Sequence, residues 1–179
     1  HHGDRKLTEA GRDDGDGPQH PDLRRLREYW RSRCGARAFP RRADIDPVDF
    51  AFMLERVALT EIHENPRRHR RRIVGSWWAI LHQLLQVGLR YRLRVVGTWW
   101  ANLLGFESTG MWMENWPHAN QRQISIDSYE ALIAARRPLC ARRDAWVDTR
   151  KLSYEIMHLP LSEDGARISM IMTAIGPGQ

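Results

Sequence analysis

Apolar and charged residues alternate most strictly over residues 89–95, which read LRYRLRV. A period of two residues is typical of a strand with one buried side and one solvent-facing side. Gly97 ends the pattern, and Thr98 is expected to cap a short helix over residues 99–104 that Gly105 terminates. The chain is therefore expected to place a half-buried strand directly before an aromatic-rich helix, which is a common way to wall a small pocket.

Helical spacing of apolar residues predicts further helices on either side of this stretch. Pro21 opens the first, and Asp46 caps a second that begins at Pro47. A third is expected to begin at Asp127 and to end before Pro138. The apolar face expected for the first helix consists of Leu23, Leu26, Trp30 and Cys34.

Alternating segments predict four more strands, over residues 56–63, 141–149, 152–161 and 167–175. Asp164-Gly165, between the last two, is a strong hairpin signal. Two early strands and three late ones, with helices between them, predict an α+β fold. We expect one five-stranded antiparallel sheet with helices on one face, plus the N-terminal helix.

Residues 68–79 (RHRRRIVGSWWA) repeat residues 90–101 (RYRLRVVGTWWA) at an offset of 22 positions. A tandem duplication of one strand-helix unit explains this agreement. The second copy keeps the strict alternation, whereas the first has Arg71 where the second has Leu93. The second copy is therefore expected in the sheet, and residues 67–88 are expected to form an inserted or duplicated strand-helix unit.

The helix of the first copy carries a wide apolar stripe, which either the domain or a second subunit must cover. A homodimer is one expected outcome, and docking on a signalling protein is another. The interface residues expected on this stripe are Trp77, Leu81, Leu84 and Leu85.

Composition narrows the class of protein. The 179 residues, 42% hydrophobic and 28% charged, are typical of one soluble globular domain, which we expect over residues 20–176. Residues 1–19 are polar and glycine-rich, so they are expected to be a disordered tail or a tag remnant. The two cysteines, the absence of a signal peptide and the polar residues within the uncharged stretch 73–89 predict a cytoplasmic protein without a membrane span.

The net charge of +6 includes one dense basic run, RRHRRR, at residues 67–72. Nucleic-acid-binding proteins usually add a recognisable module or a helix with a basic face, and neither occurs here. The run is better explained as a solvated strand end or as a contact for an acidic partner. Nucleic acid is therefore not an expected partner.

Several short motifs, in this order and spacing, resemble the bacterial single-domain PAS family typical of alphaproteobacteria. They lie at residues 40–47 (PRRADIDP), 90–93 (RYRL), 96–98 (VGT), 105–110 (GFESTG), 154–155 (YE) and 159–165 (LPLSEDG). The resemblance covers residues 23–175 apart from the extra unit. It implies a five-stranded antiparallel sheet and a helical face around a small cavity. It also implies a sensory or interaction role in signal transduction, usually without catalysis.

Six of the eight tryptophans lie between residues 77 and 116. They can line an aromatic ligand cavity, or they can serve as core and interface packing, and the sequence leaves both interpretations open. Tyr91 and His158 are the expected polar anchors of such a cavity. Its expected lining residues are Tyr91, Trp99, Trp112, Trp116, His158 and Met170.

The sequence identifies no cofactor. Haem is not expected because His82, His118 and His158 come without a supporting motif, and flavin is not expected because Cys34 and Cys140 lie outside the helix after the second strand. No metal-ligand spacing and no catalytic motif is found, so we expect no catalytic or metal-binding residues and no enzyme.

The resulting functional hypothesis is a PAS-type sensory domain that binds a small apolar or aromatic metabolite and passes the signal to a signalling protein by direct contact. The alternative is a ligand-free protein-interaction or dimerisation module.

Overall fold

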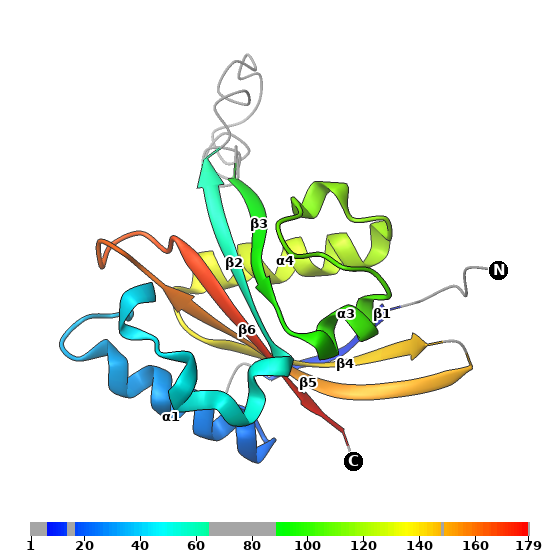
Figure 1. Ribbon diagram of the computed structural model, residues 1–179, viewed down its shortest axis with the longest axis horizontal. Helices are drawn as coiled ribbons and strands as arrows, with labels where there is room; N and C mark the ends of the chain where they lie inside the picture. Colours follow the sequence, from blue (N-terminus) through cyan, green and yellow to red (C-terminus); the bar gives the residue numbers. More distant parts are fainter. Residues whose placement is uncertain (1–6, 14–16, 65–88, 148, 179) are drawn as a thin grey trace.

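The computed structural model describes residues 7–13, 17–64, 89–147 and 149–178, with residues 7–13 and 147 described by their backbone alone (Figure 1). An antiparallel six-stranded sheet lies at its centre, with strand order β1-β4-β5-β6-β2-β3. The strands are β1 (Leu7–Asp13), β2 (Val57–Glu64), β3 (Leu89–Val96), β4 (Leu139–Val147), β5 (Arg150–Leu161) and β6 (Met170–Pro177).

The predicted five-stranded antiparallel sheet with flanking helices is confirmed by strands β2 to β6. The last three strands form the predicted meander, and the early pair β2–β3 joins it through the pairing of β2 with β6. The α+β class is therefore established by strands from both halves of the chain.

The prediction of a disordered tail over residues 1–19 is wrong for residues 7–13, which form β1 and pair with β4. A strand at the edge of a sheet is held largely by backbone hydrogen bonds to its neighbour, so it needs few apolar residues. A composition-based reading therefore misses it. By pairing with β4, β1 covers what would otherwise be the free edge of the meander.

Strand β3 is the second copy of the duplicated unit, as predicted, and it pairs with β2. Tyr91 and Leu93 are buried and Arg94 is exposed, which confirms the alternation at its centre. Val95 was expected on the buried side but is 51% exposed. A register shift between Leu59 and Thr60 moves Val95 to the solvent-facing side.

The helical segments begin with α1 (Pro21–Cys34), whose predicted apolar face is buried. Asp46 accepts the Val48 N–H at the start of η2 (Pro47–Arg56), as predicted, although η2 is a 3-10 helix with a kink. Among the described residues, three further helical segments, η1 (Arg42–Asp44), α3 (Thr98–Leu104) and η4 (Met113–Asn115), are short, and α4 (Ala119–Ala135) is the longest helix.

Two helix starts differ from the predictions. Gly97 occupies the N-cap position of α3, and Thr98 is its first residue, without a capping side-chain hydrogen bond. Helix α4 begins at Ala119 rather than near Asp127. The one buried residue in its first two turns is the polar Gln121, so the apolar periodicity on which the prediction rests is weak there.

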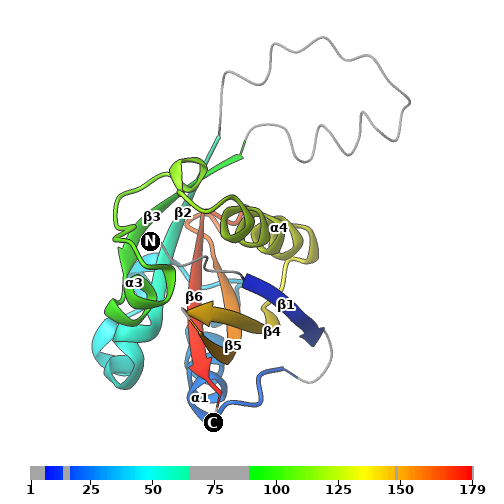
Figure 2. The same cartoon turned by 90° about the vertical axis from the view of Figure 1, so that its right-hand side faces the viewer.

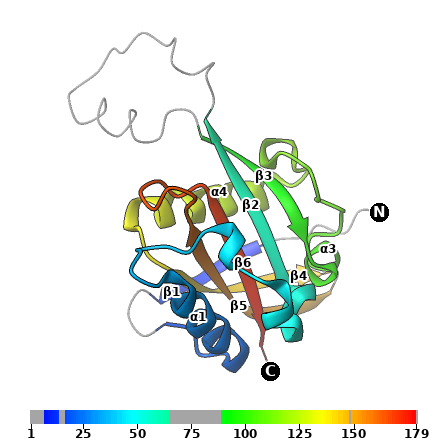
Figure 3. The same cartoon turned by 60° about the vertical axis from the view of Figure 1, so that its left-hand side comes forward.

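Helices α1 and α4 lie on opposite sides of the sheet (Figure 3), and η2 packs against α1 through Phe50 and Tyr29. The helices are therefore divided between the two faces, whereas the sequence predicted one helical face besides the N-terminal helix. His20, at the start of α1, faces the side of β6 on which a Cβ at Gly176 would point. Tyr129 of α4 contacts His158, which pairs with Thr173 and so lies on the other side of the sheet. Figure 2 shows α4 running beside β1, which it contacts.

The predicted inserted unit at residues 67–88, with the expected interface residues Trp77, Leu81, Leu84 and Leu85, lies outside the described residues.

Candidate functional site

Tyr129 of α4 links the helix to the sheet through its hydroxyl and its ring. The hydroxyl shares a 3.0 Å hydrogen bond with Thr60 Oγ1 of β2. The ring lies 5.2 Å from that of Tyr91 and 5.5 Å, edge-on, from that of His158. Burial raises the pKa of Tyr129, and hydrogen bonds from Thr60 and Thr173 oppose this only in part. Tyr129 therefore joins the two expected polar anchors, Tyr91 and His158, into one cluster.

His158 is fixed within this cluster by a second strand. Its Nδ1 lies 2.9 Å from the hydroxyl of Thr173 on β6, and the residue is buried. Tyr91 is equally buried, and burial is the main cause that raises its pKa. Both predicted anchors are therefore held on the α4 side of the sheet.

Arg143 of β4 is a buried cation at the same helix–sheet contact. It is 3% exposed, and its Nη2 donates a 2.5 Å hydrogen bond to Ser128 Oγ of α4. Ser128 Oγ in turn donates to the Ile124 carbonyl. Burial raises the pKa of Tyr154 to about 12, although the nearby Arg143 guanidinium acts in the opposite direction.

Besides Arg27 Nε of α1, five buried polar atoms have no hydrogen-bond partner among the described residues. These five belong to β3, to β4, to α4 or to the segment between α3 and α4. They are Tyr91 OH, Ser108 Oγ, Trp116 Nε1, Gln121 Oε1 and Arg143 Nε. Four of these five, all except Ser108 Oγ, belong to α4 or to residues that contact it. Native proteins leave few buried polar atoms without a partner, so this group calls for an explanation.

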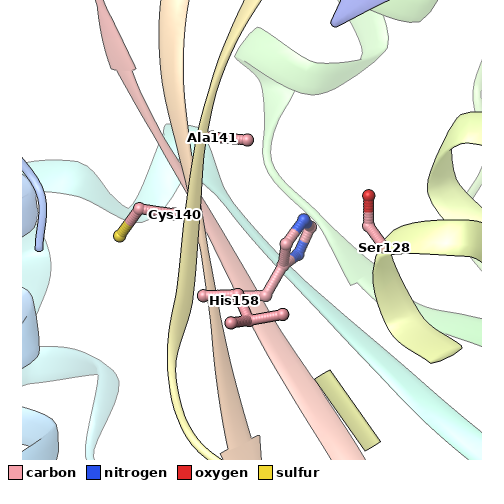
Figure 4. Close-up of a pocket in the computed structure, with 5 residues that line it drawn as sticks. Ser128, Cys140, Ala141 and His158 are labelled. Carbon is pink, nitrogen blue, oxygen red and sulfur yellow. The ribbon is translucent and has the colours of Figure 1, made fainter. Parts of the chain in front are cut away.

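A narrow pocket between α4 and the sheet is lined by Ser128, Leu139, Cys140, Ala141 and His158. Figure 4 shows His158 and Ala141 on the α4 side, while the Cys140 side chain points to the other side of β4. A water-sized sphere does not fit in this pocket. The helix and the sheet are therefore closely packed here.

The structure brings four of the six expected lining residues to the α4 side of the sheet. Tyr91 and His158 contact Tyr129, as described above. Trp116 is buried against Phe106 beside α4, and the half-buried Trp99 packs edge-on against Tyr154. Only His158 among the six lines the pocket shown in Figure 4.

The remaining two expected lining residues lie elsewhere. Trp112 pairs with Arg92 beside β3, and its ring lies 3.9 Å from the Arg90 guanidinium, on the side of β3 opposite Tyr91. Met170 lies three positions before Thr173 on β6 and therefore faces the α1 side. Neither joins the Tyr129 cluster.

Arg143 and Ser128 were missed by the sequence analysis, although β4 carries a signal that finds the arginine. Residues 139, 141 and 145 are Leu, Ala and Ala on one side of the strand, and Arg143 interrupts this apolar row. An arginine at a core-facing position of a strand is either turned to solvent by a bulge or buried because it has a specific role. Here it is buried.

Within the described part of the chain, no group of three or more His, Cys, Asp or Glu residues is placed to hold a metal ion. None of the helices described has the length and apolar character needed to span a membrane.

Residues 18–85 match the family model PAS_5, described as a PAS domain. The match begins just before α1, continues through β2 and extends beyond the described residues. The match covers less than half of the chain, and the antiparallel sheet with its flanking helices is consistent with a PAS-like fold. PAS domains are generally sensory or signalling modules rather than enzymes. No curated protein and no solved structure matches the chain.

Proposed function

We propose that this protein is a sensory module that binds a small ligand between α4 and the sheet and passes the signal to another protein through a movement of α4. The observation that carries the proposal is the group of buried polar atoms without partners beside α4. A ligand between the two layers supplies hydrogen-bond partners for such atoms.

Both the helix and the sheet contribute polar groups to the contact between them. Gln121 and Ser128 lie two turns apart on the buried side of α4. Tyr91 and Arg143 belong to strands on either side of the β2–β6–β5 centre of the sheet. A ligand beneath α4 therefore has donors and acceptors available from both layers.

Because α4 and β4 are closely packed, ligand binding between them would displace the helix, and this displacement can serve as the signal. Because a water-sized sphere does not fit beside Ser128 and His158, a ligand enters only if α4 moves away from the sheet. A ligand that binds better to the displaced arrangement shifts the population toward it. A partner protein that contacts α4 would then detect the ligand.

Native mass spectrometry of the freshly purified full chain tests the proposal. We expect a bound small molecule that is lost in the double variant Tyr91→Phe, Gln121→Leu. Absence of any bound molecule, together with concentration-dependent dimers, would instead support the ligand-free interaction module. Thr98→Ala, at an exposed position of α3, is the matched control and is expected to keep the ligand.

A further inference from the structure

Arg143 faces a site that provides no described counter-charge. It lies on the side of β4 that also presents Ala141 and Ala145, and all three residues are buried. An isolated buried guanidinium is strongly unfavourable unless a negative charge and hydrogen-bond acceptors accompany it. The surroundings of Arg143 therefore decide what the site can bind.

The described partners of Arg143 are neutral hydroxyl groups. Ser128 Oγ accepts from Nη2, the Tyr154 hydroxyl lies beside the guanidinium, and Nε has no partner. Among the side chains that the structure describes, no carboxylate forms an ion pair with Arg143. The adjacent Asp144 is paired with Lys151 and Ser153 instead.

A planar carboxylate matches this arrangement in charge and in geometry. A guanidinium presents its Nε–H and one Nη–H as a parallel fork, which binds the two oxygens of a carboxylate at once. One buried cation calls for one negative charge. A phosphate dianion would bring a second charge, for which the described side chains beside Arg143 offer no cation.

The neighbourhood of Arg143 is otherwise aromatic and apolar. Tyr154 packs against Trp99 with a centroid distance of 6.1 Å, and Ala141 and His158 line the pocket next to Ser128. An acid with a small aromatic or apolar body can therefore lie along these groups while its carboxylate reaches the guanidinium.

From this arrangement we propose that the ligand is a small aromatic or apolar carboxylic acid whose carboxylate replaces Ser128 Oγ at Arg143. The inference rests on the ligand binding proposed above and specifies its chemical class. Because the carboxylate takes the place of the Arg143–Ser128 hydrogen bond, its arrival separates β4 from α4. The same contact thus recognises the ligand and starts the movement of the helix.

Titration of the full chain with benzoate and with its neutral analogue benzamide tests this proposal, with the melting temperature and calorimetric affinity as readouts. We expect benzoate to raise the melting temperature and to bind at least about tenfold more tightly than benzamide. Arg143→Met is expected to abolish the benzoate effect without lowering the melting temperature measured with no ligand added, since it removes a buried charge. The neighbouring exposed Arg142→Met is the control and is expected to leave benzoate binding unchanged.

Ser128→Ala provides a second measurement that does not require altering Arg143. It removes the hydroxyl with which the carboxylate competes, so benzoate affinity is expected to rise. A purely structural role for Ser128 would lower stability and leave the affinity unchanged or weaker, and that result would overturn the proposal.

The remaining outcomes also decide the question. Equal binding of benzamide and benzoate would overturn the acid class but leave the proposed function standing. No binding of either probe, with no co-purified molecule in native mass spectrometry, would refute both. Preference for inorganic phosphate over benzoate would refute a carboxylate ligand.

Glu9 stands opposite Arg143 in the β1–β4 register. If Glu9→Gln lowers the melting temperature and benzoate restores it, the chain's own strand supplies the counter-charge and the proposal fails.

Discussion

The rings of Tyr91 and Tyr129 lie 5.2 Å apart, yet only the hydroxyl of Tyr129 has a hydrogen-bond partner among the described residues. Both residues are buried to the same extent, with 4% exposure. The two residues can therefore be compared directly, because they are equally buried and differ in whether the hydroxyl makes a hydrogen bond.

Phenylalanine substitutions at these two positions are expected to have different effects. Tyr129→Phe leaves buried Thr60 without its partner and should lower the free energy of unfolding by about 1–2 kcal/mol. Tyr91→Phe removes an atom that makes no hydrogen bond, so it should be neutral or slightly stabilising in the absence of ligand. Urea denaturation measures both. Equal losses in the two variants would show that Tyr91 has a partner after all.

Glu155 fixes the chain before α1 to the sheet. The side chain is 8% exposed, and its two oxygens accept the backbone N–H groups of Gln19 and His20 at 2.7 and 2.6 Å. In Glu155→Gln the amide oxygen can still accept one of these two hydrogen bonds, but the amide NH₂ group faces the other backbone N–H, and both groups are donors. The expected loss is about 2–3 kcal/mol, since hydrogen bonds to charged groups are among the stronger ones.

Glu114→Gln is the matched control for this prediction. Glu114 forms an exposed ion pair with Arg90, and pairs of this kind contribute less than about 1 kcal/mol. Thermal denaturation of both variants makes the comparison. A loss for Glu155→Gln no larger than that for Glu114→Gln would show that the N-terminal attachment contributes little to stability.

Alkaline pH is expected to destabilise the protein through its buried tyrosines. Burial raises the pKa of Tyr154 to about 12, whereas an unfolded tyrosine ionises near 10.0. Above that value the unfolded chain loses a proton that the folded protein retains, so stability falls as the pH rises from about 10 to about 12. The raised pKa values of Tyr91 and Tyr129 act with the same sign.

The Tyr154→Phe variant isolates the share of Tyr154 in this pH dependence. Its urea midpoint should decline less steeply than that of the parent protein over the same pH range. The ultraviolet absorbance of tyrosinate reports ionisation directly. A parent midpoint that stays constant across this range would contradict the prediction.

Local patterns predicted the sheet better than they predicted the site. The alternation around Tyr91 and Leu93 follows from burial on one side of a strand, so it is visible in the sequence. The exposure of Val95 depends on a bulge in the pairing with β2, which no local pattern encodes. The strand β1 depends on its partner β4 in the same way.

The candidate site depends on tertiary contacts to an even greater degree. Tyr91 and His158 were expected as the polar anchors of a cavity, but Tyr129, which connects them, was not among the expected site residues. Trp112 was expected in the pocket on composition, and pairing beside Arg92 places it on the other side of β3. Which aromatic residues meet is decided by strand pairing and helix packing rather than by their frequency.

Gly97 is required by a close approach of two backbones rather than by its own conformation. A Cβ at this position would lie 2.2 Å from the Glu55 carbonyl oxygen, and the Gly97 N–H donates to Val57 O at 2.9 Å. Its φ of −67° is open to every residue. Gly97→Ala therefore has to push α3 away from the end of η2.

This displacement should be visible in stability and in the environment of α3. We expect Gly97→Ala to lower the free energy of unfolding by about 2–3 kcal/mol and to weaken the hydrogen bond from Trp100 Nε1 to Arg56 O, with a change in tryptophan fluorescence. Thr98→Ala is the control, because Thr98 forms no capping hydrogen bond and should change stability by less than about 0.5 kcal/mol. A loss near 1 kcal/mol for Thr98→Ala would instead restore Thr98 as the cap of α3.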